Sequence, residues 1–210
     1  MINVCMGNPN PINDYDSDDP TAEERRLVAD RLVEAGFSTA RFINVEEGRK
    51  QSYDHSTGAP DSVRGNYGVY AGDGLVEIDI DDYGGDMDTA VVDGLPATFA
   101  VKTAHGGEHR YYRVENDAAS KLRTITDGAA NVSLEWGEIH AEGKYLVGPG
   151  SEITECSKSW CVACGTIGRS YEIAADRQIA TITADKLGEV VLAADGFGAD
   201  TTNQQRLVDF

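Results

Sequence analysis

The sequence has little positive charge. Lysine and arginine together number 18, of which only six are lysine, against 36 aspartate and glutamate residues, so the formal net charge is −18. The acids are spread from Asp14 to Asp209, which excludes an acidic tail on an otherwise neutral domain. An acidic chain with scarce lysine is typical of proteins that work in molar salt, where self-repulsion is screened. We interpret the protein as halophilic; an acidic mesophilic protein is the alternative.

Long apolar runs and one common nucleotide-binding motif are also missing. No apolar stretch approaches the length needed to cross a membrane, and nothing resembles a secretory signal. We therefore expect a soluble, cytoplasmic protein with no membrane partner. No G-x-x-x-x-G-K-[ST] pattern occurs, which excludes a P-loop helicase or ATPase within this sequence.

Cysteine is scarce too, with residues only at Cys5, Cys156, Cys161 and Cys164. We expect no secreted disulfide framework in a chain of this size without a secretory signal. The loop "CSKSWCVACG" has Cys-x4-Cys-x2-Cys spacing, and a C-x-x-C knuckle with a third nearby thiol predicts a structural zinc site. His140 or Cys5 could supply the fourth ligand. Unliganded thiols or a single disulfide are the alternatives.

Helix signals occur near both ends of the sequence. At the start of "DDPTAEERRLVADRLVEAGF", Asp19 can cap a helix, Pro20 suits its first turn, and Gly36 can end it. Near the other end, "TADKLGEVVLAAD" predicts a helix capped by Thr183.

The region between these helices has strand patterns. "NYGVYAG" and "LVEIDID" flank Asp73-Gly74, a dipeptide preferred in two-residue hairpin turns. Two further antiparallel pairs are predicted: 98–103 with 109–114, and 132–140 with 144–147 around a Glu142-Gly143 turn. "SYEIA" predicts another short strand, and 49–66 a long polar loop. The fold class is therefore α+β, with mainly antiparallel or mixed strands.

The stretch "GLVEIDIDD" places several acids in a strand that otherwise looks buried. Successive side chains of a strand alternate between faces. One face therefore carries Val76, Ile78 and Ile80, and the other Glu77, Asp79 and Asp81. Asp79 and Asp81 could share Mg²⁺ or Mn²⁺, which prefer oxygen ligands. A solvated strand end with an acidic outer face is the alternative.

Two more segments could carry chemistry. In "TAHGGEHRYYRV", Gly106 and Gly107 would let the backbone approach a phosphate, and His109 could donate a hydrogen bond to it. A β-turn followed by a structural histidine is the alternative. The stretch "LEWGEIHAEGKYLVGPGS" adds Glu135 and Glu138.

In this order and at these spacings, the three segments resemble the archaeo-eukaryotic primase superfamily, above all the bifunctional primase-polymerase domains of archaeal plasmids, viruses and integrated elements. The resemblance runs from about residue 66 to 173. It implies one primase-polymerase catalytic domain over 1–210 with an RRM-like sheet. Within it we expect an N-terminal αβ unit (about 1–65), a catalytic sheet (66–180) with a cysteine-rich insertion (156–164), and a C-terminal helical segment (181–210).

The resemblance also implies a role for individual residues. Asp79 and Asp81 become the first two ligands of Mg²⁺ or Mn²⁺ in a two-metal nucleotidyl transfer. Glu138 becomes the third, because its spacing to Tyr145 matches the family pattern; Glu135 is the fallback. His109 becomes the contact to the nucleotide triphosphate. The other expected nucleotide or template contacts are Gly106, Gly107, Lys102, Arg110 and Lys144.

The implied partners are a single-stranded DNA template, a primer and dNTP or NTP, in the replication of an archaeal genome, plasmid or virus. Because relatives often continue into a helicase, a helicase domain or protein is a further candidate partner. Two other functions stay open. One is a different two-metal phosphodiester enzyme, such as a nuclease. The other is a non-catalytic RRM-like module that binds single strands through Tyr111, Tyr112 and Tyr145, which would leave the aspartate pair unexplained.

Overall fold

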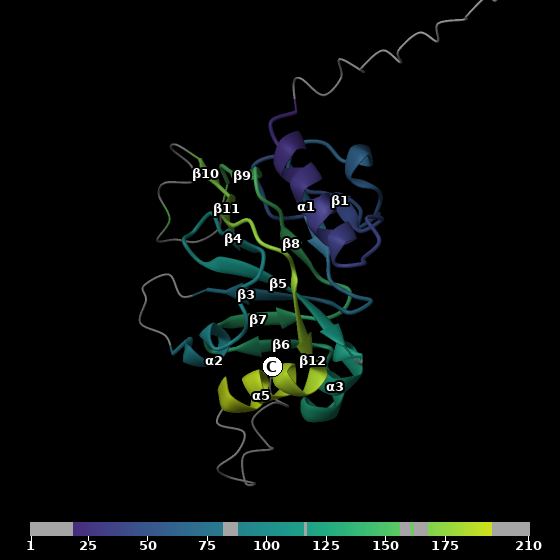
Figure 1. Ribbon diagram of the computed structural model, residues 1–210. Coiled ribbons are helices and arrows are strands. Elements are labelled where there is room, and N and C mark those ends of the chain that lie inside the picture. The colour runs from purple at the N-terminus through teal and green to yellow at the C-terminus, as the bar shows by residue number, and fades with distance from the viewer. Residues whose placement is uncertain (1–18, 82–87, 116, 156–160, 162–167, 195–210) are drawn as a thin grey trace, which may run out of the picture.

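The computed structural model describes residues 19–81, 88–115, 117–155, 161 and 168–194. It confirms the α+β class (Figure 1). The helical elements are α1 (Ala22–Glu34), the 3-10 helix η2 (Pro60–Ser62), α2 (Ala90–Asp93), α3 (Ala118–Ile125) and α5 (Ala184–Ala194). The strands are β1 (Phe42–Asn44), β2 (Tyr67–Tyr70), β3 (Leu75–Ile80), β4 (Ala100–Lys102), β5 (Glu108–Glu115), β6 (Asn131–Leu134), β7 (Gly137–His140), β8 (Tyr145–Val147), β9 (Glu152–Ile153), β10 (Arg169–Ser170), β11 (Glu172–Ala175) and β12 (Ala180–Thr183).

The described strands form three sheets: a large one, a small one, and an antiparallel pair of β9 and β10. The large sheet has the order β11-β4-β5-β3-β7-β6, and β12 pairs with β5 in parallel, so the sheet is mixed. The small sheet has the order β1-β2-β8 and is antiparallel. In Figure 1, β3, β5 and β7 lie in the middle, α1 and β1 above them, and α2, α3 and α5 below.

Each face of the large sheet contributes to a separate core. One core contains Val76, Ile78 and Ile80 and is completed by side chains of α2, α3 and α5, such as Leu187. The other contains Tyr111 of β5 and is completed by side chains of α1 and the small sheet. The alternation predicted for β3 is therefore confirmed on its apolar side, and its acidic side faces the small sheet.

The Asp73-Gly74 turn forms, but the predicted hairpin is wrong. Asp73 and Gly74 have φ values of 53° and 87°, as a tight two-residue turn requires. Gly72 and Leu75 exchange two backbone hydrogen bonds of 2.9 Å. Beyond this single pair, β2 pairs with β1 and β8, whereas β3 pairs with β5 and β7. The turn residues determine where the chain reverses. The partner of each strand depends instead on packing against residues that are distant in the sequence.

The predicted pairing of 132–140 with 144–147 is also wrong. The predicted strand 132–140 is two strands, β6 and β7, which pair with each other around a turn at Glu135 and Trp136. The side chain of Trp136 is buried in the core beside the helices. After Glu142-Gly143 the chain does not fold back on β7; β8 instead pairs with β2 in the small sheet. The backbone therefore passes from one sheet to the other at this turn.

Asp19 lies just before α1, but the predicted cap is wrong: the N-cap residue is Thr21, without a side-chain cap hydrogen bond, and Pro20 precedes the helix. Oδ1 of Asp19 accepts a hydrogen bond of 3.1 Å from the Thr21 amide, and its Oδ2 pairs with Arg25 Nη2 at 2.7 Å. Both side chains of this ion pair are buried. Desolvation raises the pKa of Asp19. The hydrogen bonds from Arg25 and Thr21 together lower it by more, so the pKa lies below its usual 3.8.

We expect Asp19→Asn to lower the free energy of unfolding by about 2–3 kcal/mol, because Arg25 would lose its charged partner. In the wild type this contribution is present above the unfolded-state pKa and is lost as pH falls through the lowered folded-state value. Urea denaturation at pH 7 and pH 3 measures both effects. The matched control is Asp185→Asn, at an exposed ion pair with Lys121, which should leave the free energy of unfolding nearly unchanged. Equal losses in the two variants would contradict the account.

No helix among the described residues is long and apolar enough to cross a membrane.

Candidate active site

Three predicted site residues form a row across three neighbouring strands. Asp79 on β3 lies directly opposite His109 on β5 and directly opposite Glu138 on β7. Side chains at directly opposed positions point to the same face of a sheet, with their Cβ atoms about 4.5–5.5 Å apart. Sheet register thus brings together residues that the chain separates widely.

This row forms the floor of a cleft between the large and small sheets. The cleft has a volume of about 510 Å³. Residues of the large sheet, of the small sheet and of the loop that follows β1 line it: Asp79, His109, Glu138, His140, Gly143, Lys144, Tyr145, Leu146, Val147, Tyr70, Lys50, His55 and Tyr171.

Asp79 is held in its ionised form by its neighbours. Its Oδ1 lies 3.4 Å from Nε2 of His109 and has no hydrogen bond of good geometry among the described residues. Burial raises the pKa of Asp79, but His109 above all, with Lys50 and His140, lowers it below its usual 3.8. A buried carboxylate oxygen without a hydrogen bond, on the floor of a cleft, can accept a cation.

Glu138 is oriented by two side chains. Its Oε1 accepts a hydrogen bond of 2.9 Å from the Ser133 hydroxyl, and its Oε2 lies 2.9 Å from Nε2 of His140. The His140 interaction is the largest effect on the pKa of Glu138 and holds it below the usual 4.5. Glu135, the fallback ligand, lies in the exposed β6-β7 turn and does not line the cleft.

The acids of β3 have three different environments, which explains how one strand accommodates them. Glu77 is completely buried opposite Tyr111 and His140. Desolvation raises its pKa well above the usual 4.5, against the smaller lowering effects of Arg41 and the Leu146 amide. Asp79 lines the cleft, and Asp81 follows the strand end, where its amide donates to the Trp136 carbonyl. Of the three, Asp79 is the one that lines the cleft, where it is half-buried.

Asp79 and Glu138 fit a hard divalent cation. Both offer carboxylate oxygens from adjacent strands, and Oδ1 of Asp79 has an unused acceptor site. Among the described residues, no group of three or more His, Cys, Asp or Glu side chains is arranged to hold a metal ion. The contribution of Asp81 to a metal site therefore stays a prediction.

The glycine turn before β5 packs against the end of β3. Gly106 has φ of 96°, which favours glycine. A Cβ atom on Gly107 would overlap the carbonyl oxygen of Ile80 at the end of β3. These glycines therefore have a structural reason to be present, and their contact with a phosphate stays a prediction.

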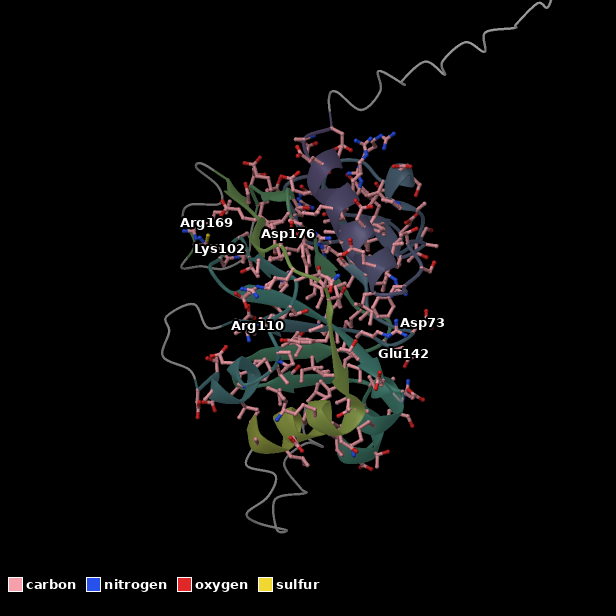
Figure 2. All side chains as sticks on the ribbon, viewed as in Figure 1. Asp73, Lys102, Arg110, Glu142, Arg169 and Asp176 are labelled. Atoms are coloured by element: carbon pink, nitrogen blue, oxygen red, sulfur yellow. The ribbon has the colours of Figure 1, made fainter. Side chains whose placement is uncertain are left out.

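Two predicted phosphate contacts lie away from the cleft. Arg110 neighbours His109 in β5 and so points to the opposite face, where it binds Asp93 at 2.8 Å and contacts Glu108. Lys102 lies opposite Glu108 on that same face and shares a separate cavity of about 530 Å³ with Arg169 (Figure 2). The structure does not bring Arg110 or Lys102 together with Asp79. Lys144, by contrast, lines the cleft.

Four polar or aromatic residues of the cleft were missed in the sequence: Lys50, His55, Tyr70 and Tyr171. His55 adopts a left-handed φ of 60°, uncommon for a non-glycine residue, and its Nδ1 lies 2.7 Å from the Tyr70 hydroxyl. Scarcity of lysine was the only signal in the sequence that could have pointed to Lys50.

The tyrosines of β5 are enclosed. Tyr111 and Tyr112 are 0% and 1% exposed. Base stacking needs an open aromatic face, so these two side chains offer no platform for single strands. This observation speaks against a binding module of the RRM type that uses them.

The zinc prediction falls mostly outside the described residues. Cys5, Cys156 and Cys164 lie there, whereas Cys161 is described and packs, partly buried, against the core beside α1. The zinc site stays a prediction.

Comparison with known protein families finds a match. The family model described as bifunctional DNA primase/polymerase, N-terminal, matches residues 16–183, which is most of the chain and includes all three sheets. A search of curated proteins finds no match. With the matched span covering the whole row of Asp79, His109 and Glu138, the chain belongs to the bifunctional DNA primase/polymerase N-terminal domain family.

Proposed function

We propose that this protein catalyses template-dependent nucleotidyl transfer as a DNA primase or polymerase. The observation that carries the proposal is the row of Asp79, His109 and Glu138 at one register level, on the floor of a cleft between two sheets. Membership of the primase/polymerase family supports it. The row combines two ionised acids with one imidazole, a set suited to binding both metal ions and phosphate.

We assign Asp79 and Asp81, with Glu138 as the third ligand, to hold Mg²⁺ or Mn²⁺. When bound, such ions lower the pKa of an attacking hydroxyl and stabilise negative charge on the phosphate oxygens. Ser133 and His140 hold the Glu138 carboxylate in place. His109, beside Asp79, donates a hydrogen bond to the triphosphate of the incoming nucleotide.

The proposed partners are a single-stranded DNA template, a primer, and dNTP or NTP. Four further parts of the proposal rest on the sequence alone: the archaeal replication context, a helicase partner, the halophilic origin and the zinc site. The division of the chain into an N-terminal αβ unit, a catalytic sheet and a C-terminal segment rests on the sequence too.

Primer extension tests the function. The protein is incubated with a labelled primer on a longer template, with Mg²⁺ or Mn²⁺, in buffers from dilute to molar KCl, and products are resolved by length. Longer products that require added nucleotides support the proposal. Shortened primer in the absence of nucleotides would instead identify a two-metal nuclease and overturn it.

A pair of isosteric variants tests the third ligand. We expect Glu138→Gln to lower the incorporation rate by at least about a hundredfold, because an amide is a far weaker metal ligand than a carboxylate. Glu135→Gln, in the exposed turn, should keep nearly wild-type activity. Both rates are measured in single-turnover primer extension at saturating nucleotide. Loss of activity in the Glu135 variant alone would reverse the assignment.

A further inference from the structure

One tyrosine fixes the loop that faces the catalytic row. The Tyr145 hydroxyl donates a hydrogen bond of 2.8 Å to the carbonyl oxygen of Lys50 and accepts one of 2.9 Å from the amide of Ser52. It therefore binds the backbone on both sides of Gln51. Tyr145 is on β8, so this contact ties the loop to the small sheet at the edge of the cleft.

The Tyr145 ring is itself confined. A Cβ atom on Gly68 of the neighbouring strand would lie 2.5 Å from Cδ2 of Tyr145, so only glycine leaves room for the ring. On its other side, the ring meets Tyr70 edge-on with centroids 5.5 Å apart. The centroid of the His55 ring lies 6.2 Å from the centroid of the Tyr145 ring. With its ring confined, the hydroxyl is placed to hold Lys50 and Ser52.

The Lys50 side chain extends toward the row. Its Nζ lies 5.7 Å from the centroid of the Tyr171 ring. The His109 ring lies 5.4 Å from that same centroid. Lys50 and His109 therefore both contact one buried aromatic ring, and the positive charge of Lys50 acts on Asp79 as well. A polyphosphate chain bound by His109 would lie within reach of Lys50.

The distribution of lysine points to the same place. Among the described lysines, Lys121 and Lys186 form ion pairs with Asp185 and Glu189 on the helical side of the molecule. Lys50 and Lys144 line the cleft. In a chain of net charge −18, two lysines at one acidic site favour a polyanionic ligand there.

We propose that Lys50 binds the terminal phosphates of the incoming nucleoside triphosphate, opposite His109, and that Tyr145 positions it. This inference rests on the proposed function and deepens it, because it assigns the residue by which the cleft distinguishes a triphosphate from a monophosphate. Lys50 touches the ligand directly, whereas Tyr145 acts through the backbone of the loop.

Nucleotide binding, measured by calorimetric titration with a non-hydrolysable dNTP analogue and with the matching dNMP, tests the assignment. Lys50→Met should weaken the triphosphate about 10–100-fold, the range for a charge-assisted hydrogen bond, and leave the monophosphate within about twofold. Tyr145→Phe keeps the ring and should weaken the triphosphate several-fold. Added to Lys50→Met, it should have little further effect. Lys50→Arg should restore most of the affinity, and Lys186→Met is the matched control.

Unchanged triphosphate affinity in Lys50→Met, in a wild type that extends primers, would overturn this inference and leave the proposed function standing. Equal loss of mono- and triphosphate binding would also overturn it, since the lysine would then be structural. Triphosphate binding that depends on Lys50 in a wild type that never extends a primer would support the site and overturn the polymerase proposal. Thermal melting of every variant separates lost binding from lost folding.

Discussion

Asp79→Ala is expected to abolish nucleotide incorporation while leaving the protein folded. Asp79 is the central member of the row, next to both His109 and Glu138. Loss of a carboxylate that holds a catalytic metal removes several kcal/mol of transition-state stabilisation, or at least about a thousandfold in rate. Because its neighbours lower the folded-state pKa of Asp79, its charge contributes to stability at neutral pH, and the melting temperature should fall slightly without collapsing. Single-turnover extension and thermal melting measure the two effects.

The matched control is Asp30→Ala, at an exposed position on α1, which should change neither quantity. If Asp79→Ala retained incorporation within about tenfold of the wild type, the row would not be the catalytic centre. Loss of activity that came with a collapse of the melting temperature would show a structural role for Asp79 instead.

Gly137→Ala is expected to give the largest loss of stability of any single change considered. Gly137 begins β7 with φ of 155° and lies opposite Ile80. Its Cβ would overlap the Asp79 carbonyl oxygen and lie 2.9 Å from the Asp79 carbonyl carbon. To accept a methyl group, β3 and β7 would have to separate at the very position where Asp79 and Glu138 meet. We expect a loss of about 4 kcal/mol or more in unfolding free energy, together with activity.

Gly143→Ala provides the comparison. Gly143 also has a positive φ, 64°, but a Cβ there meets no atom within 4 Å among the described residues. Gly143→Ala should therefore lower the free energy of unfolding only by the cost of a left-handed backbone conformation, about 1–2 kcal/mol. Denaturant titration of both variants separates close approach from backbone strain. Similar losses in the two would show that the strands can move apart at little cost.

Local patterns predicted the elements better than their partners. The cap at Thr183 and the alternation along β3 depend on neighbours in the sequence, and the structure has both as predicted. The cap of α1 lies at Thr21, two residues after the predicted Asp19. The membership of β2 and β8 in a separate small sheet was not predicted. β2 precedes the Asp73-Gly74 turn and β8 follows the Glu142-Gly143 turn, and the chemistry of each turn is satisfied whether or not its flanking strands pair. The pairing depends on which of the two cores each strand packs against, and no local sequence pattern predicts that choice.

The candidate site shows the same division. The structure places Asp79, His109 and Glu138 together because strands β3, β5 and β7 are neighbours, and the sequence motifs had singled out all three. Arg110 could have been excluded from the sequence alone, since a residue adjacent to His109 in a strand points to the other face. The scarcity of lysine could have drawn attention to Lys50, but not placed it in the cleft, because it enters from a loop that Tyr145 holds.

The most direct test of the central claim is a template exchange. Two primer-templates that differ only in the first unpaired template base are each incubated with the protein, the divalent ion and a single dNTP. A lengthened primer then shows that this dNTP was added. The account predicts that each template directs addition of its complementary nucleotide, and that Asp79→Ala adds none to either. Addition of the same nucleotide to both templates, or equal addition by Asp79→Ala, would contradict template-directed transfer at the Asp79 row.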